Sequence, residues 1–117
     1  MDFLRKIFRS RPIEKAPEEW IAVHFKLPSG SEFGLSEERT RVHIFSNELE
    51  ARIKELSVGA FDGDEYGGGE GALFMYGPNA DQLFDAVHPL LSTWELLRGG
   101  YVIKRYGMPE RSERIEF

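Results

Sequence analysis

Hydrophobic and polar residues alternate along residues 20–27, which is the periodicity of a β-strand with one buried face. The apolar residues share one face of this strand, and they are Ile21, Val23, Phe25 and Leu27. The opposite face carries a more mixed set, namely Trp20, Ala22, His24 and Lys26. Residues 28–31 contain proline and glycine, so we expect the strand to end there.

Apolar residues in the next segment recur at intervals of three and four, which predicts one helix over about residues 36–56. They are Val42, Phe45, Leu49, Ile53 and Leu56. Ser36 is a suitable cap for the start of such a helix. The alternative is a short strand at residues 41–45, followed by a helix that begins at Asn47, where Asn47 and Glu50 form a variant of the capping box. The sequence leaves both interpretations of residues 36–46 open.

The second half of the chain predicts a hairpin, a helix and a final strand. Residues 58–66 and 71–76 have extended character and flank a run of three glycines, which favours an antiparallel hairpin. Asn79 and Gln82 have the spacing of a capping pair and mark the start of a second amphipathic helix. Residues 101–106 are rich in β-forming side chains and predict the last strand.

The order of elements is therefore strand, helix, strand, strand, helix, strand. This order resembles the ferredoxin-like, or split βαβ, fold across about residues 18–107. The resemblance implies an α+β two-layer sandwich, in which a four-stranded antiparallel sheet carries two helices on one face. It is a resemblance of fold alone, because the motifs match no named family, and such a fold hosts many unrelated functions.

Outside this domain we expect two short segments with different roles. Residues 1–17 form a basic amphipathic appendage, and residues 108–117 form a loosely ordered tail. The appendage places four apolar residues on one helical stripe, Phe3, Leu4, Ile7 and Phe8. Such a stripe, flanked by basic residues, suits weak contact with a membrane surface or docking on the protein's own domain.

Composition narrows the classes of function. The chain has 117 residues, the size of one domain, and no cysteine, which excludes disulfides, thiolate metal sites and cysteine nucleophiles. Its apolar runs are much shorter than the roughly 20 residues that span a bilayer. The basic N-terminus lacks the apolar core of a signal peptide, so we expect a cytoplasmic protein.

Charge is distributed unevenly along the chain. Residues 1–17 hold five basic and two acidic residues, a net of +3, and since the whole chain carries −5, residues 18–117 carry −8. So acidic a body repels phosphate backbones, which argues against a nucleic-acid partner.

The most unusual stretch is residues 62–71, which hold four carboxylates and five glycines. Compared with a calcium-binding loop, it has Tyr66 and Leu73 at two positions that need oxygen ligands. We therefore expect a solvated hairpin tip without a metal. The alternative is a small metal-assisted hydrolase that uses the carboxylates of residues 62–70.

No arrangement of catalytic residues emerges from the sequence. His24, His43 and His88 share no ligand-like spacing, and no serine lies in a nucleophile elbow. We therefore predict a non-catalytic, cofactor-free binding or regulatory protein that contacts a partner protein, or a second copy of itself, through the open sheet face and the acidic hairpin. The predicted contact residues are Asp62, Asp64, Glu65, Tyr66 and Glu70 of the hairpin, and Trp20, His24, Tyr76, Tyr101 and Arg105 of the open face.

Overall fold

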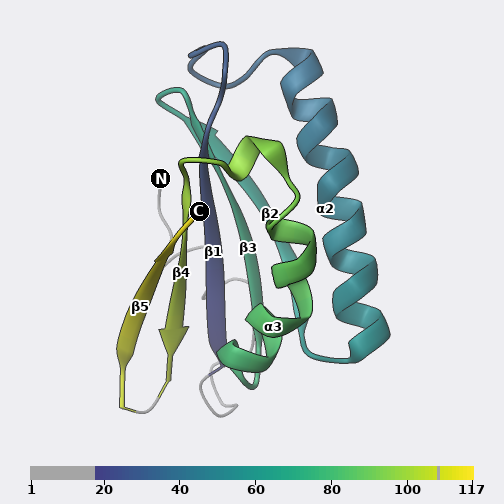
Figure 1. The fold of residues 1–117 in the computed structure, drawn as a ribbon, viewed down its shortest axis with the longest axis vertical. Coiled ribbons are helices and arrows are strands. Elements are labelled where there is room, and N and C mark those ends of the chain that lie inside the picture. The colour runs from purple at the N-terminus through teal and green to yellow at the C-terminus, as the bar shows by residue number, and fades with distance from the viewer. Residues whose placement is uncertain (1–17, 108) are drawn as a thin grey trace.

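The chain is an α+β protein with two α-helices and one antiparallel five-stranded sheet in its described part (Figure 1). A computed structural model describes residues 18–107 and 109–117. The elements in chain order are β1 (Glu19–Lys26), α2 (Ser36–Leu56), β2 (Ala60–Gly67), β3 (Glu70–Gly77), α3 (Ala80–Leu91), the short 3-10 helix η1 (Glu95–Leu97), β4 (Tyr101–Tyr106) and β5 (Arg111–Glu116). The strands lie side by side in the order β2-β3-β1-β4-β5.

The main hydrophobic core lies between the sheet and the two helices. In the central strand β1, the predicted apolar face of Ile21, Val23 and Phe25 points into this core and is almost fully buried. Side chains of α2 and α3 complete the core, and Figure 1 shows both helices on the same side of the sheet. Burial of this apolar surface is the main source of the fold's stability.

Helix α2 spans Ser36–Leu56 without interruption, which confirms the prediction made from the apolar spacing. Val42, Phe45, Leu49 and Ile53 are buried. The alternative of a strand at residues 41–45 is wrong, because the intervals of three and four place these side chains on one helical face toward the core. The capping position is Leu35 and not Ser36.

The hairpin and the second helix begin and end close to the predicted positions. Strands β2 and β3 meet at Gly68 and Gly69, whose φ angles of 61° and 81° suit a two-residue hairpin turn. The Asn79 side chain accepts a hydrogen bond from the Gln82 N–H (3.0 Å), as the capping pair predicts. Pro89 lies inside α3 near its end.

The last residues of the chain form a fifth strand, which corrects the prediction of a four-stranded sheet with a loosely ordered tail at residues 108–117. β5 pairs with β4 over its full length. Ile115 and Phe117 pack against the main core, and the Phe117 N–H donates to the Gly100 carbonyl (3.0 Å). The tail's polar sequence hides this role, because an edge strand needs few apolar residues.

A buried lysine ties β4, β5 and α3 together. Lys104 Nζ lies 2.9 Å from an Asp81 carboxylate oxygen and 3.2 Å from a Glu113 oxygen. Burial alone would lower the pKa of Lys104, but hydrogen bonds with Asp81, Tyr106 and Glu113 raise it above its usual value. Lys104 therefore remains a cation with a structural role.

None of the helices in the described part of the chain is long and apolar enough to cross a membrane. The predicted appendage, with Phe3, Leu4, Ile7 and Phe8, lies outside the described residues.

Candidate functional site

The sheet face opposite the helices, here called the helix-free face, carries three cross-strand rows of side chains. The row at the hairpin end contains Glu65, Ala72, His24 and Tyr101. The middle row contains Phe74, Ala22 and Ile103, and the row at the other end contains Tyr76, Trp20 and Arg105. The face therefore collects aromatic and charged residues from four neighbouring strands.

The middle of the helix-free face is buried, which differs from the sequence-based expectation of a bare sheet surface. Ala22 is 0%, Phe74 1% and Ala72 2% exposed, and with Trp20 they form a second apolar cluster. The accessible part of this face is therefore restricted, and the end nearest the β2–β3 turn offers a hollow.

That hollow, here called the hairpin hollow, has a volume of about 500 Å3. Its walls come from residues far apart in the sequence, namely His24, Glu65, Tyr66, Glu70 and Tyr101. Its floor is made of small residues, namely Gly67, Gly68, Gly71 and Ala72. Five of the ten predicted contact residues thus line one concave site, which is the kind of place where proteins bind ligands.

Gly71 allows the floor of the hollow to pack closely on the main core. A Cβ atom built on Gly71 would point toward the main core and lie 2.5 Å from the Phe25 ring. Phe25 fills the space beneath the strand, and only the backbone of Gly71 faces the hollow. The floor and the core are therefore packed against each other through a single peptide layer.

Hydrogen bonds to a neighbouring loop hold the rim of the hollow in place. The Leu27 N–H donates to the Gly69 carbonyl (2.9 Å), and the Gly69 N–H donates to the Glu32 carbonyl (3.1 Å). The Glu38 carboxylate in turn accepts hydrogen bonds from the Ser29 N–H (2.9 Å) and the Leu35 N–H (2.8 Å). These bonds, with that of Leu35 largest, lower the pKa of Glu38.

One wall of the hollow is a stack of three planar groups. The His24 and Tyr101 rings are 4.7 Å apart and nearly parallel, at 17°. The Arg114 guanidinium lies 3.7 Å from the other side of the Tyr101 ring and forms an ion pair with Glu116. Burial lowers the pKa of His24, Arg114 lowers it further, and Glu70 opposes both. His24 is therefore neutral at pH 7.

The hollow is acidic. Two carboxylates, Glu65 and Glu70, are among its lining residues, whereas no lysine or arginine is. Arg114, which lies over the Tyr101 ring, is already paired with Glu116. The hollow can therefore attract a cationic group, and its aromatic wall can pack against an alkyl or planar side chain.

Tyr66 and Asp64 belong to the other side of the sheet. The Tyr66 ring packs against the main core, and its hydroxyl reaches Asp64 at 3.5 Å. Burial, followed by the neighbouring Asp64, raises the pKa of Tyr66 to about 12. The phenol stays protonated at neutral pH and is unsuited to act as a base or nucleophile.

The remaining predicted residues lie outside the hollow. Trp20, Tyr76 and Arg105 form the row at the far end of the helix-free face. Arg105 makes an ion pair with Glu110, and Trp20, Tyr76 and Asp62 are each engaged in interactions. Asp62 lies where β2 bulges between Phe61 and Asp64.

The carboxylates of residues 62–70 do not converge. Within residues 18–107 and 109–117, no three histidine, aspartate or glutamate side chains are grouped closely enough to hold a metal ion. The pleat explains this, since Asp64 and Glu65 point to opposite faces of β2.

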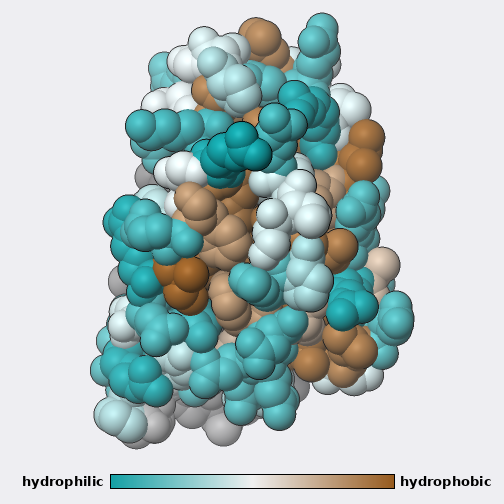
Figure 2. Space-filling model, viewed as in Figure 1, coloured by the Kyte–Doolittle hydropathy of each residue, from teal (hydrophilic) through white to brown (hydrophobic). Residues whose placement is uncertain are grey.

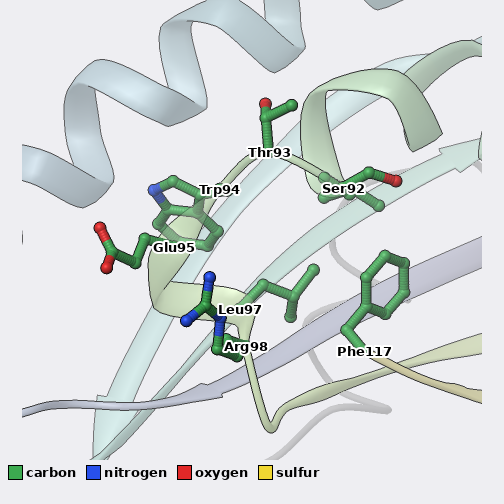
Figure 3. A pocket seen from close by; sticks show the side chains of 8 residues that line it. Ser92, Thr93, Trp94, Glu95, Leu97, Arg98 and Phe117 are labelled. Atoms are coloured by element: carbon green, nitrogen blue, oxygen red, sulfur yellow. The ribbon is translucent and has the colours of Figure 1, made fainter.

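A second hollow, which the sequence analysis missed, lies on the helix side at the end of α3. It has a volume of about 340 Å3 and is lined in part by Trp94, Glu95, Arg98 and Phe117. Figure 3 shows Trp94 and Glu95 on one side of Leu97 and Phe117 on the other. Figure 2 shows apolar atoms gathered in the middle of this side of the molecule, with hydrophilic atoms around them. Trp94 is the one lining residue whose size draws attention to this segment in the sequence. Phe117 also lines the hollow, but it comes there by way of strand β5, which the sequence did not predict.

Trp94 itself has a packing role. Its ring stacks on Phe45 of α2 at 4.1 Å and meets the edge of Phe25 at 4.9 Å. The second hollow therefore borders core aromatic residues, and its two charged residues, Glu95 and Arg98, have opposite signs. It lacks the charge bias of the hairpin hollow.

No family model, curated protein or solved structure matches this chain. The function is therefore argued from the geometry and electrostatics of the hairpin hollow.

Proposed function

We propose that this protein is a non-catalytic binding module that holds a lysine or arginine side chain of a partner protein in the hairpin hollow. The observation that carries the proposal is a concave site of about 500 Å3 that is lined by Glu65, Glu70, His24 and Tyr101 and by no lysine or arginine. The two carboxylates attract the cation, and the His24–Tyr101 stack supplies an apolar wall.

The charge of the domain supports a basic partner. Residues 18–117 carry a net charge of −8, which favours encounter with positively charged surfaces. The small floor residues leave room for an extended side chain, and the hydrogen-bonded rim limits the entropy lost on binding. Charge, shape and rigidity thus favour the same class of partner.

Binding is favoured over the metal-assisted hydrolase because the described lining residues offer few reactive groups. The hollow contains no serine, threonine or cysteine, and the Tyr66 hydroxyl, which lies on the other side of the sheet, stays protonated since its pKa is about 12. A hydrolase that used the carboxylates of residues 62–70 would need several of them on one side, whereas the pleat separates Asp64 from Glu65.

The two edge strands of the sheet argue against self-association by strand pairing. A partner is therefore expected to contact side chains and not a strand edge. The edge strand β5 has the sequence RSERIE, with four charged residues of six, and the other edge strand, β2, is acidic and bulged. Charges and bulges discourage a second copy from adding a strand. We therefore favour a different protein over a homodimer as the partner.

Two further features belong to the proposal. We infer that β1 to β4 and the two helices form a ferredoxin-like unit to which β5 adds an edge, and the strand order β2-β3-β1-β4 supports this. We also infer a cytoplasmic location, in keeping with a chain that has no cysteine for disulfides.

The test is titration of the full chain with N-acetyl-arginine amide, followed by amide chemical shifts in NMR. We expect saturable shifts at His24, Ala72, Tyr101 and residues 65–71. The neutral analogue N-acetyl-citrulline amide, which has nearly the same shape, should produce much smaller shifts.

A pair of matched variants separates the site from general acidity. Glu65→Gln with Glu70→Gln should abolish the saturable shifts, whereas Glu48→Gln with Glu55→Gln, which removes two exposed carboxylates of α2, should leave them in place. Equal shifts with both analogues, or equal losses in both variants, would falsify the proposal.

A further inference from the structure

A third hollow gathers basic residues, although residues 18–117 carry a net charge of −8. It has a volume of about 450 Å3 and lies where the end of β1, helix α2 and the segment around η1 meet. Its lining residues are Lys26, Pro28, Arg41, Glu95, Leu96 and Arg98. This site, here called the basic hollow, therefore combines three cations with one carboxylate, a net of +2.

The three cations belong to separate elements that the core holds together. Lys26 is the last residue of β1, Arg41 lies in α2, and Arg98 follows η1. The contacts of the Trp94 ring with aromatic residues of β1 and α2 join the segment around η1 to both of these elements. The fold itself therefore brings the three cations to one hollow.

Hydrogen bonds hold the backbone of the segment that carries Glu95 and Arg98. The Arg98 N–H donates to the Glu95 carbonyl (3.1 Å), and the Gly99 N–H donates to the Phe117 carbonyl (3.0 Å). Figure 3 shows the side chains of Glu95 and Arg98 extending from this segment. Because the backbone is held, less entropy is lost when these side chains bind a ligand.

The cations of the basic hollow are not neutralised by ion pairs with other described residues. The ion pairs between residues of 18–107 and 109–117 involve lysine and arginine of β4 and β5, and none involves Lys26, Arg41 or Arg98. The Glu38 carboxylate accepts hydrogen bonds from its own loop, that of the Leu35 N–H being the strongest influence. These bonds lower the pKa of Glu38, and the charge of Arg41 lowers it further. Glu38 is thus engaged by its own loop, which leaves Arg41 available to an added anion.

Charge and size indicate the class of ligand. Guanidinium groups bind phosphate oxygens through two parallel hydrogen bonds, and ammonium groups bind them as point charges. A phosphate monoester carries about −1.5 to −2 charges at pH 7, which matches the net charge of the hollow. The volume of about 450 Å3 is that of a small-molecule pocket. The acidic remainder of the domain repels long polyanions.

We propose that the basic hollow binds the phosphate group of a small molecule, with Lys26, Arg41 and Arg98 as hydrogen-bond donors. Glu95 repels the anion and so weakens its binding. This inference does not depend on the function proposed for the hairpin hollow, because the two hollows share no lining residue.

The test is titration of the full chain with glycerol 3-phosphate at pH 7 and constant ionic strength, followed by amide chemical shifts in NMR. We expect saturable shifts at Lys26, Leu27, Leu96, Arg98 and Gly99. Glycerate, which has a singly charged carboxylate in place of the phosphate, should bind at least about five times more weakly, because it offers less charge and fewer oxygens.

Matched variants separate the hollow from general positive charge. Arg41→Gln with Arg98→Gln should weaken glycerol 3-phosphate binding at least about tenfold, because charge-assisted hydrogen bonds are lost. Arg39→Gln with Lys54→Gln removes the same charge from α2 outside the hollow and should change the affinity by less than about twofold. All four side chains are exposed, so both variants should keep the fold. Glu95→Gln should strengthen binding about two- to threefold.

Four results would overturn the proposal. Shifts that grow linearly without saturation would mean that there is no site. Equal weakening in the two double variants would mean attraction by general charge, and equal binding of glycerate would mean that phosphate is not selected. A phosphoserine peptide that binds more than about ten times as tightly as glycerol 3-phosphate would assign the hollow to a phosphorylated partner protein instead of a small molecule.

Discussion

The two faces of the sheet differ in the size and the chemistry of their side chains. The helix-covered face buries large aliphatic and aromatic side chains between the sheet and the two helices. The helix-free face combines two alanines and one phenylalanine with a stack of His24, Tyr101 and Arg114 and with carboxylates at its end. The comparison shows that small residues shape the helix-free face as much as aromatic residues do. Ala72, Gly67 and Gly68 have little or no side chain, and this leaves space for the hairpin hollow.

The largest expected effect is the loss of stability when a buried ring is removed from either face of the sheet. Phe25→Ala on the helix side and Phe74→Ala on the other side should each cost about 3–5 kcal/mol of unfolding free energy, because both rings are enclosed. Urea denaturation measures this. Phe33→Ala, at an exposed position, should change the value by less than about 0.5 kcal/mol. A cost for Phe74→Ala close to that of Phe33→Ala would show that the helix-free face is solvated.

A smaller effect is expected where the two faces meet. Gly71→Ala should cost about 1–3 kcal/mol, because the added methyl group lies 2.5 Å from the Phe25 ring and forces it to move. Gly67→Ala is the control, since nothing lies within 4 Å of a Cβ atom there. The same denaturation experiment compares them, and equal costs would contradict the packing of the floor against the core.

The aromatic wall should contribute less again. Tyr101→Leu removes the ring that lies between His24 and Arg114, and we expect a loss of about 0.5–1.5 kcal/mol. Tyr101→Phe keeps the stack and should retain nearly all of the stability. If the two variants are equally destabilised, the hydroxyl group and not the stacking is what matters at this position.

The smallest effect is a pH dependence from His24. Burial holds the pKa of His24 below its ordinary value of 6.5, so the unfolded chain takes up this proton first as the pH falls. The stability that His24 contributes is therefore complete above pH 6.5 and is lost as the pH falls through the lowered pKa. His24→Gln should flatten this part of the curve of unfolding free energy against pH, whereas His43→Gln, on the exposed side of α2, should not. Identical curves for the unaltered protein, His24→Gln and His43→Gln would show that His24 does not contribute to the pH dependence of stability.

Sequence periodicity predicted the helix-covered face well, and the reason is physical. The stripe from Val42 to Ile53 and the alternation of Ile21, Val23 and Phe25 both report burial against a large apolar surface. The fifth strand escaped notice because only Ile115 among its residues packs against the core. Pairing with β4 is carried by backbone hydrogen bonds, and these leave no trace in side-chain pattern.

The candidate site was only partly predictable. His24, Glu65 and Tyr101 meet because the turn at Gly68 and Gly69 sets the register of β3 against β1, and register cannot be read from alternation alone. The face that Tyr66 occupies could not be predicted for the same reason. The bulge between Phe61 and Asp64 shifts the facing of the residues before it, which the sequence does not signal.

The charged and bulged edge strands also bear on how the protein behaves when it is abundant. A β-sheet that ends in well-formed, uncharged strands offers a template on which further chains grow into fibrils. Here the Arg and Glu residues of β5 repel an identical strand laid in parallel register, and the irregular backbone of β2 offers no regular ladder to extend. The same open architecture that leaves room for a hollow therefore comes with built-in resistance to amyloid growth.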